Sequence, residues 1–332
     1  MSQKPIISFW GTPPLAASLL RKLHACQNFE IAFTVSQPDK ARSHRGREVQ
    51  PSAVKLASGE LQIPCLTPKS LRKEESIVIN KTTEQNVDCH VILAYGKILS
   101  KSIIEQPSFG SINFHGSLLP DYRGASPIES ALKAGDKVSG YTVQKISEEL
   151  DAGDILAKEL INIDVNDNRS SLFDKICHRI EEQGPRNVLD YLQGKLKAIP
   201  QEHEKATFCG KFEPKDGLID WDWPAFKIFN LARAFSPRPG VYSFFQGKRC
   251  KLQLASVETW ENTTGQTEDH APGTIVQAEK NRIIIAAGGN STLAFSGFQF
   301  EGRKMCSSQE FLNGTKAKAG MIFSSGINIE RG

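Results

Sequence analysis

The chain has 332 residues, of which 39% are hydrophobic and 23% charged, so it can bury a core and is not a disordered polymer. Its 41 Lys and Arg against 37 Asp and Glu give a net charge of +4, which permits a polyanionic partner without requiring one. The length predicts about two domains. No stretch resembles a membrane helix or a secretory signal, so we expect a cytoplasmic protein with no membrane partner.

Strands and helices alternate in the first part of the chain. The apolar run Ile6–Trp10 predicts a buried strand, and the turn Gly11–Pro14 leads into a helix that ends near His24. Similar patterns predict strands at residues 31–35, 91–94, 112–114, 140–146 and 155–163, and helices at 51–58 and from residue 126. This alternation predicts an α/β fold with a doubly wound, mostly parallel sheet, in which ligands bind beyond the carboxyl ends of the strands.

The pattern changes in the second part. Residues 170–193 are expected to be helical, with an interruption at Gly184–Pro185, and the polar stretch 194–206 predicts a linker. Short strands separated by turns are expected at 241–245, 250–255, 274–276, 282–287 and 292–295. We therefore expect an α/β domain over residues 1–193 and a small β-barrel or β-sandwich over 207–320.

Two residues carry the first chemical signal. Asn113 and His115 are two apart on one predicted strand, so they project from the same face at its carboxyl end. Their donors suit a carbonyl oxygen that gains negative charge. A single histidine in a strand is commonly a satisfied polar residue, but Asn113 and the rigid turn at 116–120 favour a functional site.

Two further segments have alternative interpretations. Asp151 lies on a glycine-containing loop, where it is either a turn residue or a carboxylate that orients His115. Residues 37–50 form a predicted loop with four Lys and Arg against two acids. That loop either clamps phosphate or is a solvated surface loop. Residues 207–332 hold 15 Lys and Arg against 12 acids, so a nucleic-acid platform and a spacer both remain open for the β region.

Metal and nucleotide signatures are missing from the sequence. The first turn lacks the G-x-G-x-x-G pattern, and no Gly-Lys-Ser/Thr motif occurs. The seven cysteines include no C-x-x-C pair, and the seven histidines include no His-x-x-x-His pair. We therefore expect no metal site and no disulfide framework.

The segment Gly110–Ile128, followed by Leu150–Asp154, resembles the signature of the folate-dependent formyltransferases. Over nearly its whole length, the chain is similar to the branch of that family that formylates methionyl-tRNA. The matching segments include Phe9–Pro13, Val35–Asp39, Ala94–Gly96, Ile219–Trp221, Arg233–Pro237 and Ala271–Ile275. The chain departs from the pattern at Asp121 and at Glu48, and both acids weaken the electrostatic case for RNA.

The resemblance implies transfer of a formyl group from 10-formyltetrahydrofolate to the α-amino group of methionine on charged initiator tRNA. It implies that Asn113, His115 and Asp151 are catalytic and that an OB-like C-terminal barrel holds the tRNA. Folate contacts are implied at Ser117, Leu118, Leu119, Pro120, Tyr95 and Gly96, and tRNA contacts at Arg42, Arg45, Arg47 and Lys211. We expect a monomer in a bacterial cytoplasm.

Two alternative functions stay open at this point. Another formyltransferase, acting on a sugar or nucleotide amine, or a formate-releasing hydrolase would retain the same three catalytic positions. A nucleotide enzyme would not need the β region, and a sugar enzyme would not need the basic loop. A non-catalytic RNA-binding protein on an enzyme scaffold would bind tRNA without turnover.

Overall fold

The computed structural model describes residues 4–43, 46–255 and 270–326. The chain divides into two compact units, and each is described by itself. The first holds residues 1–127, 139–161 and 174–209, and the second holds 128–138, 162–173 and 210–332. Within the described ranges, no helix is long and apolar enough to cross a membrane.

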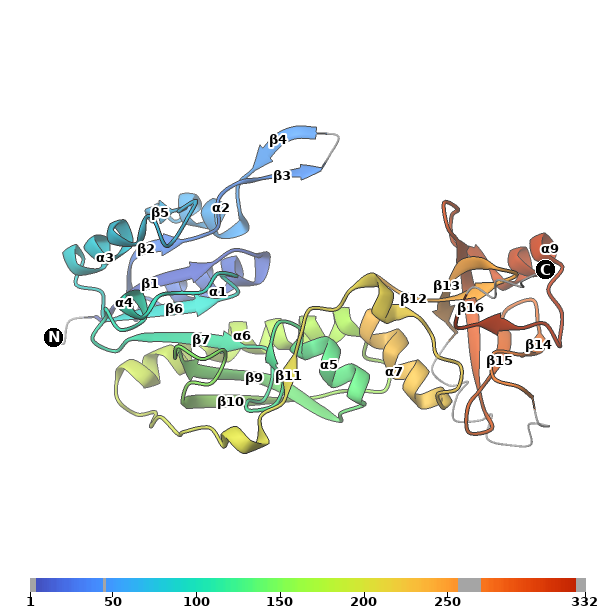
Figure 1. The fold of residues 1–332 in the computed structure, drawn as a ribbon. Coiled ribbons are helices and arrows are strands. Elements are labelled where there is room, and N and C mark those ends of the chain that lie inside the picture. The colour runs from blue at the N-terminus through green and yellow to red at the C-terminus, as the bar shows by residue number, and fades with distance from the viewer. Residues whose placement is uncertain (1–3, 44–45, 256–269, 327–332) are drawn as a thin grey trace. The chain divides into compact units, whose positions relative to one another are not determined.

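A seven-stranded sheet forms the first unit (Figure 1). Its spatial order is β10 (Ile155–Asn162), β9 (Val138–Lys145), β7 (Ser111–His115), β6 (Cys89–Leu93), β1 (Ile6–Gly11), β2 (Glu30–Val35) and β5 (Cys65–Leu66). The strands from β7 to β5 are parallel, and β9 is antiparallel to β7. The mostly parallel sheet is therefore confirmed. Its strand order reverses between β1 and β6, which is where open α/β sheets bind ligands.

Helices cover both faces of this sheet. They are α1 (Pro14–Ala25), α2 (Ala53–Glu60), α3 (Glu75–Glu84), α4 (Lys101–Ile104) and α6 (Arg169–Leu192). On one face, α6 packs so closely that a Cβ on Gly184 would lie 3.0 Å from Leu19 of α1. On the other, Val78 of α3 and Ile103 of α4 pack in one cluster with Trp10.

The expected interruption at Gly184–Pro185 is wrong, because α6 continues through both residues for 24 residues. A proline inside a helix removes one backbone hydrogen bond. Ile176 and Ile180 before this point and Val188 after it are all buried. Tertiary packing on both sides therefore holds the helix together.

Residues 40–43 and 46–50 form paired strands rather than the open loop expected over residues 37–50. Strands β3 (Lys40–Ser43) and β4 (Gly46–Gln50) pair antiparallel, and Figure 1 shows them extending beyond the sheet. The predicted RNA-contacting Arg42 and Arg47 lie on these strands, whereas Arg45 lies outside the described residues. Ala41 pairs with Val49 across the two strands, so this part of the expected loop has regular backbone pairing.

Four shorter elements lie outside the two large sheets. Strand β8 (Arg123–Gly124) pairs in parallel with β11 (Phe208–Cys209), and α5 spans Pro127–Ala134. The stretch expected to be a linker contains the 3-10 turn η1 (His203–Lys205) and a bridge from Ile199 to Ile155. This stretch therefore packs against the first unit.

An antiparallel sheet forms the second unit. Its order is β14 (Ile275–Ala278), β15 (Ile283–Ala287), β16 (Ser291–Phe300), β13 (Lys248–Leu254), β12 (Val241–Phe245) and β18 (Phe323–Ser324), and β17 (Cys306–Ser307) pairs with β16. The sequence did not predict α7 (Ala225–Phe235), α9 (Ser308–Thr315) or the 3-10 turn η2 (Pro214–Gly217). The core is aromatic: Phe298 stacks on Phe311 with ring centroids 4.3 Å apart.

Truncation of this aromatic core should destabilise the second unit. Phe311 is 1% exposed, so we expect Phe311→Ala to lower the free energy of unfolding by about 3–5 kcal/mol. Urea unfolding followed by tryptophan fluorescence measures this loss, because Trp221 packs edge-on against Phe295 in the same core. Phe226→Ala is the control, since Phe226 is 48% exposed and should cost less. Equal midpoints for both variants would contradict the packing described.

Candidate active site

Asn113 and His115 lie at the carboxyl end of β7, on one face of the sheet. The antiparallel neighbour β9 places Gln144 opposite Asn113 and Thr142 opposite His115. His115 is buried and Asn113 is half-buried. Because side chains alternate along a strand, these four polar groups share one face at the edge where ligands bind in such sheets.

His115 has a partner at each ring nitrogen. Its Nε2 lies 2.9 Å from the main-chain oxygen of Tyr122, and its Nδ1 lies 3.5 Å from Oδ2 of Asp151. The Tyr122 oxygen can only accept, so Nε2 carries a proton and donates it. Its Nδ1 is therefore the ring nitrogen that faces the Asp151 carboxylate, and the two contacts fix the orientation of the ring.

Asp151 is fixed by contacts from distant parts of the chain. The main-chain N–H of Gly124 donates to Oδ2 at 3.0 Å, and Nε2 of Gln144 donates to Oδ1 at 3.0 Å. Gln201 donates to the main-chain oxygen of Asp151 at 2.9 Å. Both carboxylate contacts come from residues outside the loop, so the side chain does more than close a local turn.

Gln201 also links the Asp151 loop to a buried arginine. Its Nε2 donates to the main-chain oxygen of Gly153 at 2.7 Å, and its Oε1 accepts from Nη2 of Arg123 at 2.7 Å. Arg123 is only 4% exposed. Gln201, which the sequence placed in a linker, therefore holds the loop that carries Asp151 in position.

Sequence reasoning missed both glutamines. Gln144 left a signal: it lies two positions from Thr142, so the two polar side chains share one face of a predicted strand. Gln201 left no signal, because a polar residue in a polar stretch is ordinary until the chain folds back.

The segment predicted to contact folate lies beside this group. Ser117 is buried and donates to the main-chain oxygen of Asp121 at 2.6 Å, and the N–H of Leu119 donates to Thr142 at 3.0 Å. Leu118 and Pro120 are partly exposed. Of the four predicted folate residues in this segment, Ser117 and Leu119 form hydrogen bonds that shape the turn. Leu118 and Pro120 have side-chain surface that a ligand can reach.

Tyr95 turns its side chain into the core. Its ring packs edge-on against Trp10 at 5.2 Å, and burial raises the pKa of Tyr95 to about 12. Its main-chain oxygen accepts from Nε2 of Gln37 at 2.8 Å and from Thr12 at 3.2 Å. Gly96 is exposed with φ +79°, so this segment offers main chain rather than a phenol to a ligand.

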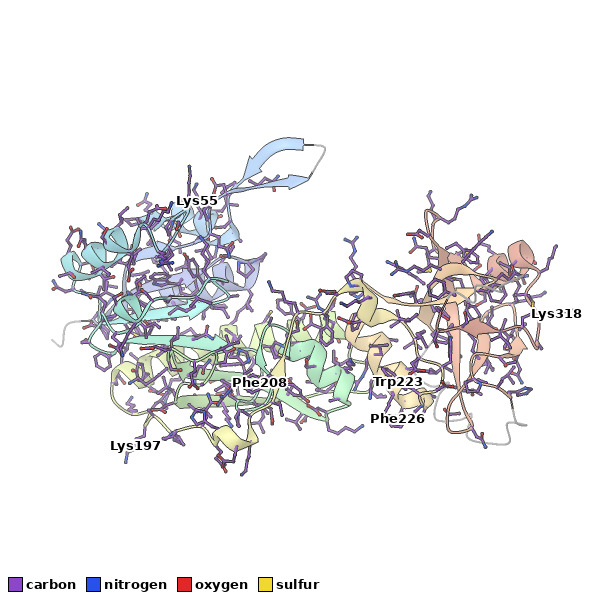
Figure 2. All side chains as sticks on the ribbon, in the orientation of Figure 1. Lys55, Lys197, Phe208, Trp223, Phe226 and Lys318 are labelled. Carbon is purple, nitrogen blue, oxygen red and sulfur yellow. The ribbon has the colours of Figure 1, made fainter. Side chains whose placement is uncertain are left out.

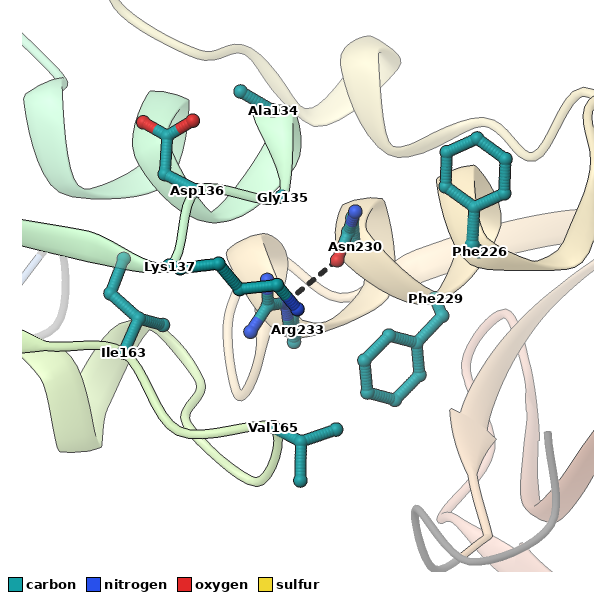
Figure 3. Close-up of a pocket in the computed structure, with 10 residues that line it drawn as sticks. All are labelled: Ala134, Gly135, Asp136, Lys137, Ile163, Val165, Phe226, Phe229, Asn230 and Arg233. Carbon is teal, nitrogen blue, oxygen red and sulfur yellow. Dashed lines mark hydrogen bonds between the residues drawn. The ribbon is translucent and has the colours of Figure 1, made fainter. Parts of the chain in front are cut away.

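The remaining predicted positions lie elsewhere. Lys211 is an exposed residue of the second unit. That unit also has a cavity of about 340 Å³, shown in Figure 3, where Arg233 donates from Nε to Asn230 at 2.9 Å. None of the predicted catalytic residues lines it. In the described part of the chain, no group of three His, Cys, Asp or Glu is placed to hold a metal ion.

Comparison with known proteins assigns the chain to a family. Residues 4–188 match the family described as "Formyl transferase", and residues 211–316 match "Formyl transferase, C-terminal domain". The chain belongs to the formyl transferase family. The active-site group described above lies almost wholly within the first matched range.

Several curated relatives carry one name. The methionyl-tRNA formyltransferase of Sulfurihydrogenibium sp. (strain YO3AOP1) is 35% identical over 96% of this chain and 99% of that protein. That of Geobacter metallireducens is 37% identical over 95% of this chain and 97% of that protein. The crystal structure of WlaRD, a sugar 3N-formyl transferase studied with dTDP and 5-N-formyl-THF, superposes with a TM-score of 0.62. It is 16% identical and covers 91% of this chain and 100% of that one, so it shows the shared fold.

Removing the amide of Gln144 should slow formyl transfer without unfolding the protein. Gln144→Ala leaves one oxygen of Asp151 without its donor, a loss of about 1–3 kcal/mol. That loss corresponds to roughly 5- to 150-fold in turnover. The matched control is Gln106→Ala, since Gln106 is exposed and its side chain donates to Thr83, away from the site.

The Gln144→Glu variant separates a positioning role from simple packing. A carboxylate has nearly the shape of the amide, but it has no N–H for Oδ1 of Asp151 and its charge repels that carboxylate, so turnover should fall further than in Gln144→Ala. Unchanged turnover in both Gln144→Ala and Gln144→Glu would exclude the role assigned to this residue.

Proposed function

We propose that the protein transfers the formyl group of 10-formyltetrahydrofolate to the α-amino group of methionine on charged initiator tRNA. The observation that carries the proposal is the His115–Asp151 pair, 3.5 Å apart, beside Asn113 at the end of β7. The support for the substrate is similarity to methionyl-tRNA formyltransferases over about 96% of the chain.

The residues present suit a folate formyl donor. The carboxamide of Asn113 has no hydrogen-bond partner within the described residues, although it is half-buried between β6 and β9. A half-buried amide without a partner favours a ligand oxygen at that point. We assign folate binding to Ser117, Leu118, Leu119 and Pro120 and to the main chain of Tyr95 and Gly96.

The chemistry follows from the positions of these groups. The methionyl amine attacks the formyl carbon, so a C–N bond forms and the carbonyl oxygen gains negative charge. Asn113 donates to that oxygen. His115 already has a partner at each ring nitrogen, so it positions the Asp151 carboxylate rather than donating a third hydrogen bond to that oxygen. The carboxylate of Asp151 takes the amine proton and passes it to the folate nitrogen as the bond to the formyl group breaks.

The RNA contacts are assigned to both units. We assign contact with the tRNA to Arg42 of β3, to Arg47 of β4, to Arg45 and to exposed Lys211. Arginine suits phosphate because its planar fork donates two parallel hydrogen bonds. The protein acts as a monomer in the bacterial cytoplasm on this account.

The catalytic residues are tested by truncation. Asn113→Ala, His115→Ala and Asp151→Ala should each lower turnover by about 10²–10³, the usual cost of losing one group that stabilises the oxyanion. The measurement is transfer of labelled formyl from 10-formyltetrahydrofolate to methionyl initiator tRNA, with circular dichroism to show retained folding. A His115→Ala enzyme with near-normal turnover would falsify the assignment.

The substrate is tested with wild-type protein. We expect transfer to methionyl initiator tRNA and much less to methionyl elongator tRNA. Failure to formylate either RNA, with transfer to a sugar or nucleotide amine instead, would replace the proposed substrate.

The hairpin is tested by the salt dependence of tRNA binding. Arg45→Ala with Arg47→Ala should weaken binding and reduce the slope of log K against log salt by about one unit for each phosphate that the protein no longer neutralises. Lys158→Ala with Lys197→Ala is the charge-matched control, since both lysines are exposed and carry no predicted role; Lys197 is labelled in Figure 2. An unchanged slope in the double variant would remove the hairpin from the RNA contact.

A further inference from the structure

The sheet of the second unit carries two cations on one face. Along β13, Cys250 and Leu252 are buried, whereas Arg249 and Lys251 are only partly buried and project from the opposite face. Tyr242 of β12 lies opposite Lys251. Three positions of neighbouring strands therefore combine two positive charges with an aromatic ring.

Arg249 is held by this ring. Its guanidinium carbon lies 3.8 Å from the centre of the Tyr242 ring, which is the geometry of a cation–π contact. Phe244, opposite Arg249 on β12, packs edge-on against Tyr242 at 6.1 Å. The fork of Arg249 is thus oriented before any ligand arrives, which lowers the entropy lost on binding.

A cavity of about 180 Å³ lies at these cations. It is lined by Arg249, Lys251, Gln299, Phe300, Glu301 and Gly302. Its size is below the 300–1,000 Å³ or so of whole small-molecule pockets, so it suits a single chemical group better than a nucleotide.

The hydrogen bonding of Arg249 is incomplete. Its Nε is buried and has no acceptor within the described residues. An unsatisfied buried N–H of a charged group is costly, and an incoming anion would supply the acceptor. In the described ranges, neither Arg249 nor Lys251 is within ion-pair distance of an acid, and the acid of this cavity, Glu301, is exposed.

We propose that the cavity at Arg249 and Lys251 binds a phosphate of the RNA backbone. The identity of that RNA as the tRNA substrate rests on the function proposed above. Phosphate matches the planar fork of Arg249, and Lys251 adds a point charge beside it. Phosphate contacts position an RNA without distinguishing its sequence. The site therefore strengthens binding of initiator and elongator tRNA alike.

The test is tRNA binding by the full-length protein, measured by filter binding over a range of salt concentrations without a formyl donor. Arg249→Gln with Lys251→Gln should raise the Kd about tenfold and reduce the salt slope by about one unit. Glu301→Gln removes the acid at the cavity and should lower the Kd. Circular dichroism and the thermal midpoint show that each variant folds.

A charge-matched control separates the site from net charge. Lys318 follows α9, is exposed and is labelled in Figure 2. Lys316, one residue past the end of α9, is exposed as well, so Lys316→Gln with Lys318→Gln removes the same two charges and should change the Kd less than twofold. The proposal is overturned if Arg249→Gln with Lys251→Gln binds no more weakly than this control.

Two further outcomes identify the ligand and separate the two proposals. Inorganic phosphate could stabilise wild type, but not the double variant, against unfolding, while both bind tRNA equally well. In that case the site binds a free anion and the RNA assignment is wrong. If wild type binds tRNA through this site but formylates no methionyl-tRNA, the site stands and the proposed function fails. If wild type formylates tRNA and the double variant keeps full affinity, only the site fails.

Discussion

The site depends on the hydrogen bonds that hold the Asp151 carboxylate against His115. The N–H of Gly124 and the amide of Gln144 each donate to one oxygen of that carboxylate. Gly124 has φ +115°, and a Cβ there would lie 2.3 Å from the main-chain oxygen of Cys209. Only glycine therefore allows β8 to pair with β11 while its N–H points at Asp151.

Further hydrogen bonds connect the Asp151 loop to segments that are distant in the sequence. Gln201 reaches Asp151 from a segment fifty residues later in the chain, and Arg123 lies immediately before Gly124. Movement at any of these points would shift the carboxylate away from the Nδ1 of His115. Catalysis by positioned groups tolerates little displacement, and Arg123 and Gln201 are both buried. On the function proposed above, they would hold the catalytic geometry without touching substrate.

Much of the fold could be predicted from local patterns. Asn113 and His115 were identifiable because alternation on a strand places both on one face, and Pro127 marked the start of α5. The residues that hold Asp151 in place could not be predicted. Gln201 reaches Asp151 only because the later segment folds back and pairs with Ile155. Helix α6 contradicted local propensity at Pro185, since tertiary packing outweighed the lost hydrogen bond. The orientation of Tyr95 was also not predictable from the sequence, because its ring is held in the core by packing against Trp10.

We propose that the clamped carboxylate of Asp151 moves the amine proton during formyl transfer. Asp151→Asn keeps the shape of the side chain and removes its charge. The direct measurement is the single-turnover rate of formyl transfer from 10-formyltetrahydrofolate to methionyl initiator tRNA, with enzyme in excess. We expect the rate to fall by at least about 10², as for other groups that act in proton transfer. Transfer at the wild-type rate would contradict the account.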